Sequence, residues 1–586
     1  MFKLLNLKGN FNNVRNLYTK SSSIDTSRIL TPHAIEFLKE LNDICINDYD
    51  ECLLIRNKQF KKKKYGLRND TKSIRDSDWK INDIPLNLSN RHVELTGPGD
   101  SKSMVVNAFN SNANGYMLDL EDSMTPSWKN IINAHSNVYD AVRGNLRDIK
   151  YDNEGNIIKQ YKISNNNQPT FFMRSRGLHM KEYNMLDISD NPMSATIFDI
   201  GLHLYNNGEY LHKNGLGPYL YIPKLESYED AKLINKIITE AQKIIGLPNG
   251  TTKTTVLIET FPAIFQTDEI IYALKDHIAG LNCGRWDYLF SMIKCLGNDT
   301  ILPDRDILTM DKPFLEAYVD QIVNSCHRRG IHAMGGMSAF IPTSDKSEYA
   351  SILNKITKDK MLEIERGCDG AWVAHPGLIS DIKDVFEREL KQDNQKDVYK
   401  DIKFSNKMFT DLGNDSKYTV EVLRNNINVS LQYISAWLSG NGAVALNGLM
   451  EDLATAEISV HQIRQWYNAS LFDLNEQKFS DIVDDEFDKM LNDNQVNYAS
   501  AHFDTAKHVL KEYVFNNNYK FLPEVASKHL LYDRKYKGIK FDDNILHKLG
   551  GSHGYLTGVD LTKQRGEFLN RYLYDENNSA YKFLGT

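Results

Sequence analysis

Eight short apolar runs, separated by longer amphipathic stretches, constrain the fold of this 586-residue chain more than any other feature. Each run is long enough for a β-strand and too short for a helix. The runs are Val93 to Leu95, Tyr116 to Leu120, Thr170 to Met173, Tyr219 to Ile222, Thr255 to Ile258, Ile278 to Leu281, Ile331 to Met334 and Ala371 to Val373. Strands that alternate with helices predict βα units and a parallel sheet.

Most of these runs have a polar or charged residue at or just beyond their C-terminal end: Asp119, Arg174, Lys224, Glu259, Asn282 and His375. Eight βα units predict a (β/α)8 barrel, and such a barrel carries its active site at the C-terminal ends of its strands. An open, doubly wound sheet would normally have a glycine-rich phosphate loop after its first strand, and the sequence has none there. The predicted fold class is therefore α/β, with a TIM barrel.

The segments on either side of the predicted barrel favour helices. Residues 28–90 have apolar residues at helical spacing, with Pro32 suited to a first helical turn, so we expect an N-terminal helical arm. The barrel is expected to span residues 91–393, with a solvated insertion at residues 151–168. Beyond it the β signals stop, and we expect residues 394–586 to form a C-terminal all-helical domain.

Residues 1–27 are predicted to be a separate segment. The first 24 contain four basic residues and no acidic one, together with the run Ser21 to Ser23. This composition fits a mitochondrial transit peptide and a disordered basic tail equally well. The chain ends in Phe-Leu-Gly-Thr, which is not a peroxisomal Ser-Lys-Leu type of signal. The expected localisation is thus an organelle, either mitochondrial or peroxisomal/glyoxysomal, with the cytoplasm as the alternative.

The charge balance argues against nucleic-acid and membrane partners. The chain has 70 basic and 77 acidic side chains, a net charge of −7, which provides no general attraction for polyanions. The six cysteines have no CxxC pair and no zinc-like spacing with histidine, which indicates reduced thiols inside a cell. No apolar stretch approaches the ~20 residues of a transmembrane helix. We expect small-molecule partners, and a homo-oligomer is compatible with this composition.

Two carboxylates on consecutive predicted strands form the first candidate site. Glu259 follows the run Thr255 to Ile258, and Asp287 comes shortly after the run Ile278 to Leu281. Adjacent parallel strands lie about 4.8 Å apart, so the two side chains can converge. A hard cation such as Mg2+ takes one or two protein carboxylates and keeps positions for water and substrate oxygens. Either acid alone would more often cap a helix, but the pair favours a metal site.

Three further acids, Asp119, Glu121 and Asp122, lie at the end of the second predicted strand. They repel one another unless a cation or an arginine neutralises them. Two interpretations stay open: the acids orient metal-bound water, or they cap the following helix.

Basic residues end the third and fourth predicted strands. A guanidinium at Arg174 could hold a carboxylate or stabilise an enolate, and Arg176 is its competitor. A structural ion pair is the alternative for either arginine. For Lys224, an ion pair with the neighbouring acids is preferred over Schiff-base chemistry.

Ordered motifs along the chain are too specific to arise by chance. The longest runs from Thr255 to Ser291, TVLIETFPAIFQTDEIIYALKDHIAGLNCGRWDYLFS. The others are Leu118-Asp-Leu-Glu-Asp-Ser, Gly217-Pro-Tyr-Leu-Tyr-Ile-Pro-Lys-Leu-Glu-Ser, Ala333-Met-Gly-Gly-Met, Asp369-Gly-Ala-Trp-Val-Ala-His-Pro-Gly-Leu and Met450-Glu-Asp-Leu-Ala-Thr-Ala-Glu-Ile-Ser. Together they resemble the shorter, A-type malate synthases of the glyoxylate cycle, over about Ile29 to Trp466.

This resemblance implies a magnesium-dependent acyltransferase that joins the acetyl group of acetyl-CoA to glyoxylate. It implies that Glu259 and Asp287 bind Mg2+. It also implies that the backbone from Gly284 through Arg285 and Trp286 to Asp287 surrounds the glyoxylate carboxylate.

The same resemblance assigns Arg174 as the catalytic arginine and Asp452 as the base, and it places Ser123 and Pro376 in contact with acetyl-CoA. In isolation, Glu451 and Asp452 would be interpreted as a solvated pair within a helix. The chemistry needs both catalytic types, because a carboxylate can deprotonate the weakly acidic methyl group only if the enolate charge is stabilised. Because the base follows the barrel in sequence, the site is expected between the barrel and the C-terminal domain.

Several positions depart from the usual family pattern. Ser175 and Leu178 replace a proline and a tryptophan of the arginine motif, and residues 440–445 read Gly-Asn-Gly-Ala-Val-Ala instead of Gly-Asn-Gly-Cys-Val-Pro. Val460 replaces an arginine, and residues 549–586 do not match the family. None of these changes removes a catalytic group that the resemblance assigns, but they put local rigidity and CoA affinity in question.

Two alternative functions stay open. One is a malyl-CoA or citramalyl-CoA lyase on the same kind of barrel, which would use the same paired carboxylates. The other is an inactive barrel retained as a binding protein. The C-terminal domain with Asp452 argues against the first, and the intact Glu259, Asp287 and Arg174 argue against the second.

Overall fold

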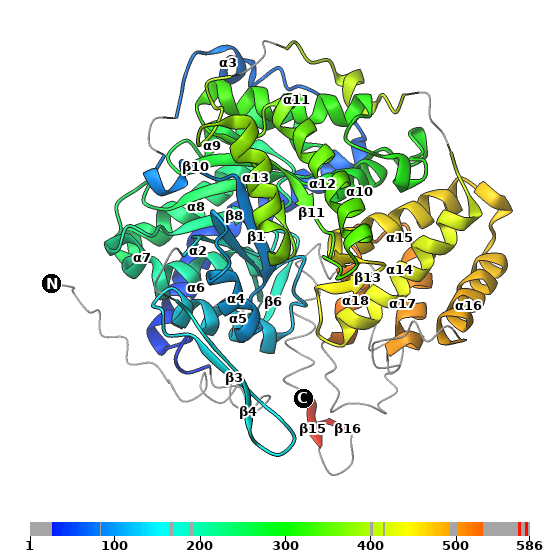
Figure 1. The fold of residues 1–586 in the computed structure, drawn as a ribbon, viewed down its shortest axis with the longest axis horizontal. Helices are drawn as coiled ribbons and strands as arrows, with labels where there is room; N and C mark the ends of the chain where they lie inside the picture. The colour runs from blue at the N-terminus through cyan, green and yellow to red at the C-terminus, as the bar shows by residue number, and fades with distance from the viewer. Residues whose placement is uncertain are drawn as a thin grey trace.

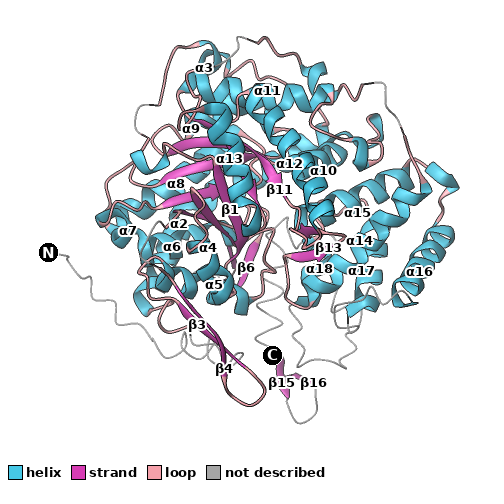
Figure 2. Ribbon diagram, viewed as in Figure 1, coloured by secondary structure: helices cyan, strands magenta, loops and turns pink. Residues whose placement is uncertain are grey.

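A closed, eight-stranded parallel barrel forms the centre of the molecule, with helices around it (Figure 2). Its strands are β1 (Val93–Pro98), β2 (Gly115–Asp119), β5 (Thr170–Arg174), β8 (Tyr219–Ile222), β9 (Lys253–Ile258), β10 (Ile278–Cys283), β11 (His332–Ser338) and β12 (Gly370–Val373). Neighbours pair in the order β1-β12-β11-β10-β9-β8-β5-β2. Each of the eight predicted runs overlaps one barrel strand, so the α/β TIM-barrel prediction is confirmed.

This computed structural model describes residues 26–81, 84–164, 168–187, 191–398, 402–413, 417–492, 502–530, 572–575 and 580–583. The predicted targeting segment therefore lies outside the described residues, except for its last two positions. The unmatched segment 549–586 also lies outside them, apart from the backbone of the paired strands β15 (Tyr572–Asp575) and β16 (Ala580–Phe583).

The inside of the barrel is filled by side chains. Eight buried residues pack there: Leu88, Met117, Phe172, Tyr219, Tyr221, Leu257, Ala279 and Trp372. A buried ion pair joins them, in which Arg91 Nε donates to Glu94 Oε1 over 2.7 Å. Arg91 Nη2 also donates to the Tyr221 hydroxyl over 2.7 Å. Because the interior is occupied, a ligand can bind only at an end of the barrel.

Helices cover the outer face of the barrel (Figure 2). They are α4 (Lys102–Phe109), α5 (Trp128–Ala141), α6 (Ala195–His203), α7 (Glu209–Lys213), α8 (Tyr228–Ile245), α9 (Thr267–Ala273), α10 (Arg285–Leu296), α11 (Pro313–Arg329), α12 (Lys346–Arg366) and α13 (Ile379–Leu390). The strands are buried on both faces, which explains why each one reads as a continuous apolar run in the sequence.

The N-terminal arm contains the long helix α2 (Pro32–Lys62) and the short helix α3 (Lys72–Asp76). Thr31 caps α2 by accepting a hydrogen bond from Ala34 N, and proline occupies the first turn as predicted. The helix packs against α6 and α8, and Arg56 forms a buried ion pair with Asp230 of α8. The arm thus shares its hydrophobic core with the barrel.

Two β-hairpins interrupt the βα pattern between the second and fourth barrel strands. Strands β3 (Arg147–Tyr151) and β4 (Ile157–Lys162) form the first, which overlaps the predicted insertion at 151–168 and is mostly exposed. It extends away from the body of the molecule in Figure 1. The second hairpin consists of β6 (Lys181–Leu186) and β7 (Pro192–Ser194).

The C-terminal domain is helical and lies to the right of the barrel, yellow to orange, in Figure 1. Its helices are α14 (Val420–Leu438), α15 (Leu453–Asn468), α16 (Glu476–Asn492), α17 (Phe503–Phe515) and α18 (Pro523–Leu530), and they bury a core of their own.

The expectation that β structure stops after residue 393 was wrong. Strands β13 (Val444–Leu446) and β14 (Leu449–Glu451) form a tight hairpin within this domain. Asn447 and Gly448 form its turn, both with positive φ, at 50° and 77°. An Asn-Gly pair is a strong hairpin signal, so the sequence did contain the information.

The hairpin joins the C-terminal domain to the barrel. Met450 N donates to Ala339 O over 2.7 Å, and Ile341 N donates to Gly448 O over 2.9 Å. Phe340 and Leu449 pair as an isolated antiparallel bridge. The residues that follow barrel strand β11 therefore continue into a small sheet with β14.

We expect Gly370→Ala to destabilise the barrel by about 3 kcal/mol, because an overpacked core forces the backbone to move. A Cβ atom at Gly370 would lie 1.8 Å from the carbonyl oxygen of Arg91. The control is Gly97→Ala in β1, where an added Cβ meets nothing within 4 Å. Denaturant unfolding measures both free energies. Equal stability of the two variants would contradict the strand packing described here.

Candidate active site

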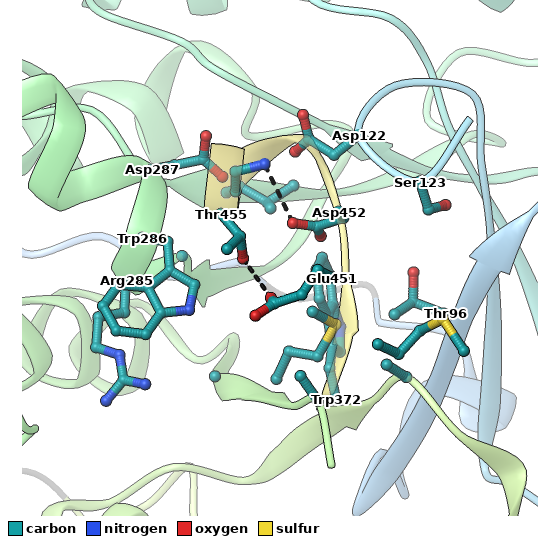
Figure 3. Close-up of a pocket in the computed structure, with 18 of the residues that line it drawn as sticks. Thr96, Asp122, Ser123, Arg285, Trp286, Asp287, Trp372, Glu451, Asp452 and Thr455 are labelled. Atoms are coloured by element: carbon teal, nitrogen blue, oxygen red, sulfur yellow. Dashed lines mark hydrogen bonds between the residues drawn. The ribbon is translucent and has the colours of Figure 1, made fainter. Parts of the chain in front are cut away.

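A pocket of about 1130 Å3, including its open mouth, lies between the C-terminal ends of the barrel strands and the C-terminal domain (Figure 3). The C-terminal domain contributes Ala443, Met450, Glu451, Asp452, Ala454 and Thr455. Of the nine predicted site residues, eight line this pocket: Ser123, Arg174, Glu259, Gly284, Arg285, Trp286, Asp287 and Asp452. Pro376 is exposed and is not among the lining residues.

Arg174, at the end of β5, is held in place by Asp119 at the end of β2 and by Asp122 in the loop after it. Its Nε and Nη2 atoms donate to the two carboxylate oxygens of Asp119 over 2.6 and 2.5 Å. Its Nη1 atom lies 3.3 Å from Asp122 Oδ2. Although burial opposes it, this guanidinium lowers the pKa of Asp119. The remaining donors of Arg174 are therefore aimed in a fixed direction.

Arg176, the competing arginine, lies elsewhere. It donates to Asp199 and Glu182 over 2.8 to 2.9 Å and is completely buried. It is absent from the lining of this pocket. The structural ion pair is thus the role that the structure gives to Arg176, whereas Arg174 lies at the pocket.

Lys224 forms ion pairs with three acids, as the sequence predicted. Its Nζ atom lies 2.9 Å from Asp122, 3.2 Å from Glu121 Oε2 and 3.2 Å from Asp287 Oδ1. Its backbone N–H donates to Glu259 Oε1 over 2.7 Å, and its φ of 50° lies in the left-handed region. Burial opposes the charge of Lys224, but the surrounding acids, Asp122 and Asp287 first among them, raise its pKa well above the ordinary value, and it remains a cation.

Asp122 does not cap the following helix, which was one of its two predicted roles. Ser127 caps α5 instead, by accepting a hydrogen bond from Asn130 N. Asp119 also serves the loop itself, because its oxygens accept hydrogen bonds from Glu121 N and Ser123 N.

The acids at the barrel mouth exceed the cations that face them. Asp119, Glu121, Asp122, Glu259 and Asp287 are buried, and two cations, Lys224 and Arg174, lie among them. Burial, reinforced by the mutual repulsion of the acids, raises the pKa of Glu121 and Glu259 well above the ordinary value. Burial likewise raises the pKa of Asp287 to about 6. The site thus holds uncompensated negative charge.

Two carboxylate oxygens of this cluster are suited to a cation. Glu259 Oε2 is buried and has no hydrogen-bond partner, whereas Asp287 Oδ1 is buried and lies 3.2 Å from Lys224 Nζ. The space beside Glu259 exists because residue 284 is glycine: a Cβ there would lie 2.8 Å from Oε2. Among the described residues, no group of three or more His, Cys, Asp or Glu could hold a metal. A cation here would therefore take two carboxylates and find its other ligands in water or substrate.

Helix α10 begins with Arg285, directly beside these carboxylates. The first-turn N–H groups of a helix have no acceptor within the helix and favour an anion. The Gly284 N–H is already used, because it donates to the Tyr318 hydroxyl over 2.9 Å. An anionic group here would thus meet the N–H groups of Arg285, Trp286 and Asp287.

Asp452 lies where strand β14 ends and helix α15 begins. It caps the helix, since its Oδ1 accepts a hydrogen bond from Ala454 N over 3.1 Å. Glu451 is only 5% exposed and accepts a hydrogen bond from Thr455 Oγ1 over 2.6 Å. The interpretation of these acids as a solvated pair within a helix was therefore wrong. Burial and the charge of Asp122 raise the pKa of Asp452 well above the ordinary value.

The sequence missed several residues of the pocket. Trp372 donates from Nε1 to Glu94 Oε2 over 3.2 Å, and its ring lies 5.7 Å from the Arg174 guanidinium. It falls within a predicted strand, so alternation could have placed it inside the barrel. Asp359 and Glu363 of α12 also line the pocket, and acids on an amphipathic helix carry no signal of such a role.

Comparison with known proteins gives two family matches. The model described as "Malate synthase, TIM barrel domain" matches residues 170–412, and "Malate synthase, C-terminal" matches residues 417–530. The malate synthase of Myxococcus xanthus is 41% identical over 501 residues, which cover 82% of this chain and 90% of that protein. This chain belongs to the malate synthase family. Its activity is accordingly that of a malate synthase enzyme, as the motifs predicted.

Other members of the malate synthase family are similarly close. Malate synthase A of Escherichia coli is 44% identical over 459 residues, 77% of this chain and 84% of that protein. The glyoxysomal malate synthase of Candida tropicalis is 44% identical over 432 residues, 71% and 77% of the two chains. Among the residues that the structure describes, no helix has the length and apolar character needed to span a bilayer.

Solved malate synthase structures resemble this chain more weakly. A pyruvate/acetyl-CoA ternary complex of the Haloferax volcanii enzyme has a TM-score of 0.45 and 15% identity, and it covers 68% of this chain and 98% of that one. A magnesium/glyoxylate complex of the same enzyme has a TM-score of 0.40 and 12% identity, with 71% and 97% covered.

We expect Lys224→Met to lower the free energy of unfolding by about 3 to 5 kcal/mol, because it leaves buried acids without their cation. The control is Lys489→Met, which removes an ion pair with Asp485 between side chains that are about half exposed and should change stability by less than ~1 kcal/mol. Denaturant unfolding at pH 7 compares the two. Equal losses would mean that Lys224 does not neutralise this cluster.

Proposed function

We propose that this malate synthase condenses acetyl-CoA with glyoxylate in the presence of Mg2+ and then hydrolyses the thioester to release malate and CoA. One observation carries the proposal. Asp452 of the C-terminal domain lines the same pocket as Arg174, Glu259 and Asp287 of the barrel. A base, an enolate-stabilising cation and a pair of metal ligands are thus available to one bound substrate pair.

Glu259 and Asp287 fit the role of Mg2+ ligands. Glu259 presents a buried oxygen without a hydrogen-bond partner, the buried Asp287 Oδ1 shares only the charge of Lys224 Nζ 3.2 Å away with other acids, and both carboxylates are hard donors of the kind that Mg2+ prefers. The surplus of acids over Lys224 and Arg174 would be relieved by a divalent cation. When bound, the metal supplies positive charge that polarises the carbonyl of glyoxylate.

Asp452 acts as the base in this proposal. A carboxylate with a raised pKa is a stronger base than an ordinary one, and acetyl-CoA has only weakly acidic methyl protons. The hydrogen bond from Ala454 N engages Oδ1, so that Oδ2 is the oxygen left to take the proton. The resulting enolate carries negative charge on the thioester oxygen.

Arg174 stabilises that charge. Asp119 holds two of its nitrogens, which fixes the guanidinium plane before substrate binds. Its pKa is raised well above the ordinary value by the surrounding acids, although burial opposes this, so it stays charged throughout the reaction. A donor that needs no reorganisation contributes most to transition-state stabilisation.

The start of α10 provides a place for the glyoxylate carboxylate. N–H groups of Arg285, Trp286 and Asp287 face an anion at the helix N-terminus, next to the proposed metal ligands. Ser123 and Thr96 lie on the side of the pocket away from Arg285 and Trp286, and this is the side proposed for acetyl-CoA (Figure 3). The proposed contact of Pro376 requires the CoA chain to extend beyond the pocket, because Pro376 is exposed.

A lyase on the same barrel is the second candidate. It would use Glu259 and Asp287 but would not need a base from a further domain. The presence of Asp452 in the pocket favours the synthase.

The decisive assay mixes the purified protein with acetyl-CoA, glyoxylate and Mg2+ and follows free CoA thiol. We expect thiol release that requires both substrates, that stops when EDTA removes the metal, and that returns with added Mg2+. Accumulation of malyl-CoA without thiol would establish the lyase. No turnover with any divalent metal would establish an inactive binding protein.

We expect Asp452→Asn to lower kcat at least ~100-fold, because the amide cannot accept the proton. Asparagine caps a helix as well as aspartate does, so the fold should be preserved. The Mg2+-dependent rise in melting temperature should also remain. Asp481→Asn, an exposed change in the same domain, serves as the control. Near-normal turnover of Asp452→Asn would rule out this base.

For localisation we propose an organelle, on the basis of the basic segment 1–24. The Candida tropicalis relative is named glyoxysomal. A fluorescent fusion with and without residues 1–24 tests the role of this segment. An unchanged cytoplasmic signal in both fusions would exclude it.

A further inference from the structure

We propose that Tyr433 is a positioning residue that sets the base Asp452 against Arg174, and that it acts through the backbone carbonyl of Asp122. The proposal rests on the proposed function and deepens it. Asp452 and Arg174 come from different domains and must keep a fixed separation, because proton abstraction and charge stabilisation have to act on the same substrate.

Asp122 is one of the residues through which the two domains are in contact. Its carbonyl oxygen accepts a hydrogen bond from Tyr433 Oη over 3.2 Å and another from Leu453 N over 3.1 Å. Its carboxylate faces the barrel, 2.9 Å from Lys224 Nζ and 3.3 Å from Arg174 Nη1. Asp122 thus contacts Arg174 through its side chain and Leu453, the residue after Asp452, through its backbone carbonyl.

Tyr433 is the residue of the C-terminal domain whose side chain bonds to Asp122; we call this hydrogen bond between the two domains the tie. It is completely buried in α14, and its hydroxyl also lies 2.8 Å from Gly442 O. A hydroxyl has one hydrogen, so the two carbonyl oxygens of Asp122 and Gly442 share it. Burial, with the neighbouring carboxylates of Asp452 and Asp122, raises the pKa of Tyr433 well above the ordinary value, so the hydroxyl always retains its hydrogen.

The backbones at this tie are in direct contact. A Cβ atom at Gly442 would lie 2.6 Å from the N and Cα atoms of Met124, two residues after Asp122. Thr125 Oγ1 donates to Trp437 O over 2.9 Å, one turn along α14 from Tyr433. The loop after β2 is therefore attached to the C-terminal domain at several adjacent points, and the Tyr433 hydroxyl shares its acceptor, Asp122 O, with the amide of Leu453, the residue after Asp452.

The position of Asp452 follows from this attachment. The next amide, Leu453 N, is bound to Asp122 O, and the Asp452 carboxylate is bound to Ala454 N. Without the Tyr433 hydroxyl, Asp122 O would keep only the Leu453 amide. The loop that holds Asp122 could then shift relative to α15, and the separation of Asp452 and Arg174 would shift with it.

The test compares Tyr433→Phe with Tyr418→Phe. Both substitutions remove a hydroxyl from the C-terminal domain. Tyr418 precedes α14, and its Oη atom donates over 3.0 Å to the carbonyl oxygen of Ile301, which follows α10 in the chain. Tyr418 does not line the pocket. For Tyr433→Phe we expect kcat to fall about 10- to 100-fold while both KM values stay within about threefold, because a small misplacement of catalytic groups has that effect.

A second measurement separates positioning from general loosening. With trideuterated acetyl-CoA, the isotope effect on kcat should rise in Tyr433→Phe, because proton abstraction becomes slower. Tyr418→Phe should keep the kcat and the isotope effect of the unmodified enzyme. If Tyr433→Phe does not fold, Thr125→Val, which removes the neighbouring tie with little change of shape, should show the same fall in kcat.

The outcomes also separate this inference from the proposed function. Equal kcat values for Tyr433→Phe and Tyr418→Phe, with an active unmodified enzyme, would overturn the inference alone. An unmodified enzyme that releases no CoA thiol would overturn the proposed function first. Loss of kcat in Tyr433→Phe with a raised isotope effect would support both.

Discussion

Compensation of buried negative charge at the barrel mouth determines how the rest of the site is built. Five buried acids meet there, and the cations among them are Lys224 and Arg174. A buried charge is tolerated only when it is paired, so each cation is held by several acids at once. Glu259 and Asp287 line the pocket, where Glu259 Oε2 has no hydrogen-bond partner and Asp287 Oδ1 shares the charge of Lys224 with other acids. The same shortage of cations that requires Lys224 and Arg174 to pair with several acids thus leaves carboxylates suited to the metal site proposed above.

Among the described residues that line the pocket, those of the C-terminal domain include no cation. This domain contributes Glu451 and Asp452, two further acids, at a hairpin-helix junction that backbone hydrogen bonds attach to the barrel. A carboxylate placed beside other carboxylates has a raised pKa, which is unfavourable for folding and useful for a base. The attachment through Asp122 and Ala339 holds these like charges together.

Much of the fold could be predicted from the sequence, because strands that are buried on both faces leave continuous apolar runs. The Glu259 and Asp287 pair could be predicted for the same reason, since strand ends in a barrel converge. The role proposed for Asp452 could not be predicted from its neighbours in the sequence, because its place in the pocket depends on a tertiary hydrogen bond between the next residue, Leu453, and Asp122. Family resemblance pointed to it instead. The β13–β14 hairpin was missed although Asn447-Gly448 signals it, and Tyr433 left no signal because a buried aromatic residue in a helix is ordinary.

The barrel is closed by its first and last strands, where Val93 lies opposite Ala371. A chain emerging from the ribosome therefore carries β1 with one edge unpaired until β12 has been synthesised, and such an edge is prone to aggregation. The hairpin that presents Asp452 emerges later still. Under the proposed roles, the metal ligands Glu259 and Asp287 precede the base Asp452 along the chain, so the complete site requires both domains.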